Sequence, residues 1–140
     1  MTAQKMDALD IEIYQLMKEL GIPASMTGYD YLRSAIRRSA ENGCPKISTM
    51  SADGIYPRIA EEFGVSSNSV ERAIRKSIGV GVERAGGSKF YKVFGLSMDA
   101  DKARPTNAQF IRQAALEILC RKSEKNLKTA GQKRETWQIG

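Results

Sequence analysis

Apolar residues recur at helical spacing along most of the chain, and no segment alternates apolar and polar residues as a half-buried strand would. Leucine and isoleucine share one face of a first predicted helix over residues 7–20, and Gly21 follows as a stop signal. A second helix is predicted to begin near residues 27–28, and Gly43 and Pro45 end it. The pattern therefore predicts an all-α fold.

The second half of the chain continues this pattern. A short apolar cluster formed by Phe90, Val93, Phe94 and Leu96 is expected to form a brief helix on the core, after a loop at Gly86-Gly87. Thr106 and Gln109 have the spacing of a capping box. They are predicted to start a last helix, whose broad apolar face ends at roughly residue 120.

The C-terminal segment differs from the rest of the chain in composition. From Arg121 onward there are six basic residues against two acidic ones, and few apolar residues. Such a segment cannot offset its ordering entropy by burying apolar surface. We therefore expect one helical domain over residues 1–122, followed by a basic, disordered tail over residues 123–140.

Residues 56–75 have the spacing of a helix-turn-helix. Ala60 is the small residue that two crossing helices need at their closest approach, and Gly64 can take the positive φ of a tight turn. An apolar seam falls at helical spacing across both helices, formed by Ile59, Phe63, Val65, Val70 and Ile74. Because Pro57 lacks an N–H, the first helix is expected to begin near Ile55 and to hold Pro57 in its first turn.

The second helix of this hairpin, about residues 66–78, is the predicted recognition helix. Ser66 or Ser67 can serve as its N-cap, and Gly79 and Gly81 weaken its continuation. Its residues outside the seam are of types that contact base edges and phosphates in a major groove. They are Ser66, Ser67, Asn68, Glu71, Arg72, Arg75 and Lys76. A helical hairpin without a DNA-binding role is the alternative, because such spacing is common in helical proteins.

Composition narrows the possible functions. The net charge of +6 and a pI near 9.4 favour a polyanionic partner. Histidine is absent, and Cys44 and Cys120 are isolated, so the sequence predicts no metal site, no cofactor site and no enzyme active site. It contains no export signal and no membrane-length apolar run. We expect a cytoplasmic protein with reduced thiols; a disulfide between the two cysteines is the alternative.

Four motifs in order resemble the effector domain of the stage-zero sporulation protein A response regulators. The hairpin carries the first, YPRIAEEF at residues 56–63 followed by VERAIR at residues 70–75. The others are ELGIPA at residues 19–24, GYDYLR at residues 28–33 and ARPTNAQFI at residues 103–111. The resemblance is collinear over about residues 8–122, which makes it far more specific than a lone helix-turn-helix.

The resemblance implies a domain of about six helices, without a wing, whose third and fourth helices form the DNA-binding hairpin. It implies binding to double-stranded DNA at boxes like TGTCGAA, as a transcription regulator of sporulation. Tandem copies, and thus a homodimer on repeated sites, and contact with an RNA polymerase sigma factor are also implied. Glu71 and Arg72 would contact base edges, which suits the acceptor and donor groups of cytosine and guanine. Arg75 and Lys76 are better placed for phosphate.

The sequence also departs from the family. Ser69 stands where the family usually has an arginine, so we include Ser69 among the candidate DNA contacts and expect a shifted preference at one position of the site. The family's receiver domain is absent from this sequence. Either the effector domain has been separated from its receiver, or the protein acts without one, which the start at Met1 and the distinctive tail favour. The alternative function is a protein-interaction module that pairs with a full-length regulator or sigma factor without productive DNA recognition.

Overall fold

The structure, a computed structural model, describes residues 6–44, 54–95 and 104–139, with side chains as far as residue 128. Over these ranges it is all-α, as predicted, with six helices and no strand. The helices are α1 (Ala8–Glu19), α2 (Thr27–Glu41), α3 (Ile55–Phe63), α4 (Ser67–Ala85), α5 (Gly87–Phe94) and α6 (Asn107–Ile139). Leu96, the end of the predicted apolar cluster, lies outside the described residues.

Polar side chains fix the starts of three helices. Asp7 caps α1 by accepting from the Asp10 backbone N–H at 2.9 Å, and Ser66 caps α4. Before α6, the Thr106 backbone N–H donates to Gln109 Oε1 at 3.0 Å, and the Gln109 N–H donates to Thr106 Oγ1 at 3.2 Å. These reciprocal bonds confirm the predicted capping box.

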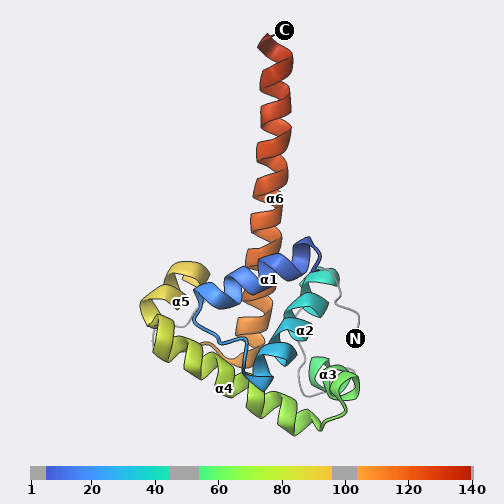
Figure 1. Cartoon of the computed structure of the whole chain (residues 1–140), viewed down its shortest axis with the longest axis vertical. Coiled ribbons are helices and arrows are strands. Elements are labelled where there is room, and N and C mark those ends of the chain that lie inside the picture. The colour runs from blue at the N-terminus through green and yellow to red at the C-terminus, as the bar shows by residue number, and fades with distance from the viewer. Residues whose placement is uncertain (1–5, 45–53, 96–103, 140) are drawn as a thin grey trace.

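Helix α2 is the centre of the fold. It packs against α1, α3, α4 and α6, and α5 closes the core where Phe90, Phe94 and Phe110 meet. Figure 1 shows α4 along one side of the molecule and α6 projecting from the opposite side. The packing therefore leaves one face of α4 uncovered, on the side of the molecule opposite the projecting part of α6.

Gly28 allows α2 and α4 to cross at close range. A Cβ atom added at Gly28 would lie 2.1 Å from Ser77 Oγ and 2.2 Å from the Ala73 backbone oxygen. No side chain fits in that space, so only glycine at this position permits the observed crossing.

Helix α4 is longer than its glycines lead the sequence analysis to expect, since it continues through Gly79 and Gly81 to Ala85. Gly81 faces the turn after α1, where an added Cβ would lie 2.7 Å from the Leu20 backbone oxygen and 2.8 Å from Ile22 Cγ1. Close packing thus offsets the poor helix propensity of glycine, which is about 1 kcal/mol relative to alanine. The predicted loop at Gly86-Gly87 is a sharp turn, with φ 88° at Gly86, from which α5 starts at once.

The last helix runs beyond the packed domain. Its buried face ends at Ile118, the side chains of residues 122–128 are exposed, and the backbone stays helical to Ile139, through the segment for which the sequence predicts disorder. Arg121 joins α6 to Glu19 of α1 at 3.0 Å, and Lys125 pairs with Glu12 of α1. The division at residue 122 into a domain and a tail stays a prediction.

Arg37 ties the start of α1 to α2. Its guanidinium binds Asp7 at 2.7 Å, Asp10 at 2.8 Å and Glu41 at 3.1 Å. The hydrogen bond from Arg37, together with that from the Asp10 backbone N–H, holds the pKa of Asp7 below its usual value of 3.8. A carboxyl whose pKa is lowered by folding stabilises the fold above about pH 4, and that contribution is lost as the pH falls further.

Asp7→Asn should therefore lower the melting temperature at neutral pH and lower it less in acid. Asparagine is also a good N-cap, so the change removes the charge and keeps the cap. The difference in melting temperature from the unchanged chain is expected to be largest at pH 7 and to shrink as the pH falls below about 4, so that it is clearly smaller near about pH 2. In that range the unfolded chain takes up a proton on Asp7, whereas the paired carboxyl of the folded chain does not. High salt should also reduce it, because the pair is exposed. A difference of equal size at both pH values would contradict the assignment.

Candidate nucleic-acid interface

The α3–α4 hairpin has the predicted turn. Gly64 lies in the left-handed region at φ 66°, and the Val65 N–H donates to the Ala60 backbone oxygen at 2.9 Å. Ile59, Val70 and Ile74 are fully buried along the seam. Helix α3 begins at Ile55, so Pro57 stands in its first turn as expected. The turn and the buried seam thus fix α4 against α3.

The seam is narrower than predicted. Phe63 and Val65 are each 37% exposed. Phe63 is the last residue of α3, and its ring packs edge-to-face on Tyr31 of α2, with ring centroids 5.0 Å apart. These two residues therefore lie at the rim of the hairpin, because the core is closed by α2 rather than by α3 and α4 alone.

Serine hydroxyls occupy the start of α4. Ser66 Oγ accepts from the Ser69 backbone N–H at 3.1 Å, and the two hydroxyl oxygens are 2.9 Å apart. Ser66 is thus the N-cap, as predicted, and Ser69 is bound to it. Ser67 is half-buried in the first turn. The free N–H groups and positive dipole end of a helix favour an anion near this point.

A strip of cations follows on the outer face of α4. Arg72, Arg75 and Lys76 are all exposed and fall three or four residues apart, so they share one side of the helix; we call them the α4 strip. Exposed Asn68 lies one turn before Arg72 on the same side. The opposite side is buried in the core. The structure thus brings the predicted polar side chains together on the accessible face of α4.

Glu71 lies at the edge of this face and is paired. Its carboxylate binds the Arg75 guanidinium, and the two side chains are 20% and 59% exposed. A surface pair of this spacing contributes only about 0.3–0.5 kcal/mol. It can therefore be opened at small cost when a nucleic acid offers each group a new partner.

Asn107 fixes the hairpin to α6, a role that the sequence analysis did not identify. Its Nδ2 donates to the Tyr56 hydroxyl of α3 at 2.8 Å and to the Glu71 backbone oxygen of α4 at 3.1 Å. These partners are 51 and 36 residues away in the sequence, so no local spacing indicates them. A single amide group thus holds the two helices of the hairpin at one point.

Asn107→Ala is expected to lower the free energy of unfolding by about 1–3 kcal/mol, because it leaves two partly buried groups without this donor. Urea denaturation would measure the loss. Asn126→Ala, on the exposed part of α6, is the matched control and should change stability by less than about 0.5 kcal/mol. Equal stability of the two variants would show that the Asn107 bonds contribute nothing net.

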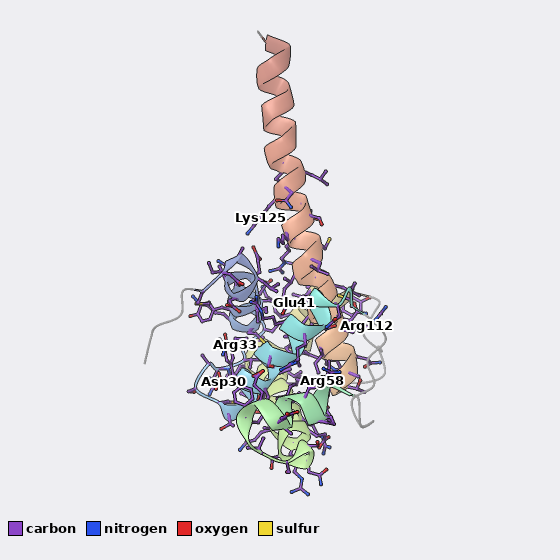
Figure 2. All side chains as sticks on the ribbon, turned by 90° about the vertical axis from the view of Figure 1, so that its right-hand side faces the viewer. Asp30, Arg33, Glu41, Arg58, Arg112 and Lys125 are labelled. Atoms are coloured by element: carbon purple, nitrogen blue, oxygen red, sulfur yellow. The ribbon has the colours of Figure 1, made fainter. Side chains whose placement is uncertain are left out.

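Cations from outside α4 lie near the same end of the molecule. Figure 2 shows Arg58, on α3, close to the end that α4 occupies, and Lys125 far from it on α6. Arg104 comes from the segment before α6, and its Nη2 donates to the Arg75 backbone oxygen of α4 at 2.8 Å. No local sequence pattern indicates a role for Arg104 in the site, because the contact spans 29 residues.

Three further findings concern metal-ligating groups, membrane spans and cysteines. The described residues contain no group of three or more metal-ligating side chains. Within the same ranges, no helix combines the length and apolar character needed to cross a bilayer. Both cysteines are free in the structure; Cys44 is buried and Cys120 is exposed. The exposed face of α4, opposite its buried face, is the candidate site because it gathers the polar and cationic side chains described above.

A comparison with known protein families adds an independent finding. The family described as sporulation initiation factor Spo0A C terminal matches residues 13–118. The matched range covers more than half of the chain. It runs from α1 to the end of the buried face of α6, and it includes the hairpin and Asn107.

Proposed function

The chain belongs to this Spo0A C-terminal family of DNA-binding sporulation regulator domains, and on that premise we propose that it binds double-stranded DNA sequence-specifically to regulate transcription. The observation that carries the proposal is the α4 strip, three cations exposed on one face of a helix whose other face is buried. An α-helix fits the major groove of B-DNA, and the exposed face is the one that would enter it.

The proposed contacts divide into two kinds. Arg72, in the second turn of α4, donates to guanine O6 and N7, and Glu71 accepts from cytosine N4. Arg75 and Lys76, farther along the helix, bind phosphate and set the register of the helix on the duplex. Opening the Glu71–Arg75 pair leaves both groups available at the cost of a weak surface interaction.

The start of α4 approaches the sugar-phosphate backbone. Asn68 is exposed there, and the hydroxyls of Ser66, Ser67 and Ser69 lie beside the N–H groups of the first turn. Since Ser69 is bound to the Ser66 hydroxyl and is short, it makes at most a local contact, so one base position is held less strictly than an arginine would hold it.

The preferred site follows from the resemblance of the hairpin sequence. We propose boxes of the TGTCGAA type, occupied by two copies of the chain where boxes are repeated, with an RNA polymerase sigma factor as a further partner. The cytoplasm is the proposed compartment. Support for these points comes from the collinear motifs and the family, whereas the α4 strip supports DNA binding itself.

Fluorescence anisotropy with one TGTCGAA-type duplex and a scrambled duplex tests the proposal. We expect tighter binding to the box and a linear fall of log K with log salt, with a slope of about −0.9 for each phosphate contacted. Equal, weak binding to both duplexes would contradict sequence-specific recognition. That outcome would favour the protein-interaction module, for which the small, internally bound Ser69 is the supporting observation.

A further inference from the structure

The Arg104 guanidinium lies close against α4 at Gly79. A Cβ atom added at Gly79 would lie 2.8 Å from Arg104 Nη1 and 3.8 Å from its Cζ. The guanidinium therefore lies too close to position 79 for a side chain to be added there without a shift. The hydrogen bond from Arg104 Nη2 to the Arg75 backbone oxygen, at 2.8 Å, holds it there.

Position 79 continues the α4 strip. It is seven residues after Arg72, four after Arg75 and three after Lys76, which places all four positions on one side of the helix. Exposed Glu83, four residues beyond, carries the opposite charge. The Arg104 guanidinium thus lengthens the positive strip by one turn, and the strip ends before Glu83.

We propose that Arg104 contacts a DNA phosphate and that Gly79 is the residue that makes room for it. This inference rests on the proposed function, since it adds a contact to the same interface. The guanidinium has five N–H donors, of which the Arg75 oxygen uses one, so others remain for a phosphate. Its position beyond Arg75 and Lys76, the proposed phosphate contacts, places it on the sugar-phosphate backbone rather than on a base edge.

The geometry also accounts for a glycine in a helix interior. Any side chain at position 79 would meet the guanidinium. Glycine therefore stands in this helix despite its poor helix propensity, because it leaves room for the arginine. The nearest atom is the flexible end of a side chain rather than backbone. Gly79→Ala should therefore keep the fold and displace the arginine.

The first test compares Arg104→Ala with the unchanged chain by anisotropy on the box and scrambled duplexes over a series of salt concentrations. The salt slope should become less steep by about 0.9, the amount for one phosphate contact. On either duplex, the affinity of the unchanged chain divided by that of Arg104→Ala should then shrink about 3.5-fold between about 50 mM and about 200 mM salt. Both duplexes should lose affinity by the same factor, because a phosphate contact carries no base preference.

Two further variants separate charge, position and folding. Lys122→Ala removes one positive charge from the exposed part of α6 and should leave the slope unchanged. Gly79→Ala should keep or raise the melting temperature while reducing the slope, and should add nothing in the Arg104→Ala background. Loss of the box preference in Arg104→Ala would mean that the residue positions α4 rather than contacts phosphate, and would overturn the inference.

The proposed function and this inference fail in different ways. If the unchanged chain shows no salt-dependent binding to either duplex, the proposed function is wrong. If the unchanged chain binds but a folded Arg104→Ala variant has the same slope, only the role of Arg104 is wrong. The melting temperature of each variant establishes that it is folded.

Discussion

Arg72→Ala is expected to weaken binding to the preferred duplex by about 1–3 kcal/mol, roughly 5- to 150-fold, and to relax the base preference at one position. Arg72 is the first residue of the α4 strip and is exposed, and the other two residues of the strip are also cations. Removing it deletes a bidentate contact to guanine, whereas removing Arg75 or Lys76 should weaken binding to all sequences alike. Anisotropy with duplexes that carry each base at each box position would measure the change.

Arg112→Ala is the matched control for Arg72→Ala. Arg112 is also exposed, but it lies on α6, and Figure 2 shows it apart from the end that α4 occupies. The control should keep the base preference and most of the affinity. If Arg72→Ala keeps both as well, Arg72 does not contact a base, and the orientation proposed for α4 is wrong.

Gly28→Ala is expected to have the largest effect on stability. The added Cβ would overlap the Ala73 backbone oxygen at 2.2 Å and Ser77 Oγ at 2.1 Å. A backbone oxygen cannot rotate away as a side chain can, so α2 and α4 would have to separate. Overpacking of this kind costs about 1–3 kcal/mol and occasionally more. Urea denaturation, with the midpoint and slope fitted for each variant, would measure the loss.

Gly87→Ala provides the comparison. Gly87 begins α5, and a Cβ added there meets no atom within 4 Å. This control should match the unchanged chain or exceed it slightly, because alanine favours a helix. Similar free energies of unfolding for Gly28→Ala and Gly87→Ala would mean that the crossing can relax, and that the close contact of α2 with α4 is not what fixes the fold.

Local signals were sufficient where a structure depends on residues close in sequence. The cap at Ser66, the left-handed turn at Gly64 and the reciprocal bonds of Thr106 and Gln109 each join residues a few positions apart, and the sequence analysis found all three. The all-α class and the exposed polar face of α4 follow from helical periodicity in the same way.

Contacts between distant segments were not predictable by this route. Helix propensity alone predicts that Gly81 weakens α4. A propensity scale contains no information about the turn after α1, which packs on this glycine. The exposure of Phe63 depends on how α2 closes the core, and the roles of Asn107 and Arg104 depend on partners tens of residues away. The candidate site was therefore predictable on α4 itself, but not in the residues that reach α4 from the start of α6.

The position of Cys120 has a practical consequence. It is exposed on α6, just beyond the last buried residue of that helix, Ile118, and α6 leaves the molecule on the side opposite α4 (Figure 1). Cys44 is buried, and its burial raises the pKa of its thiol. A smaller fraction of the Cys44 side chains is therefore in the reactive thiolate form. A maleimide dye or a surface linker should thus attach selectively at Cys120, which would present immobilised molecules with α4 directed outward.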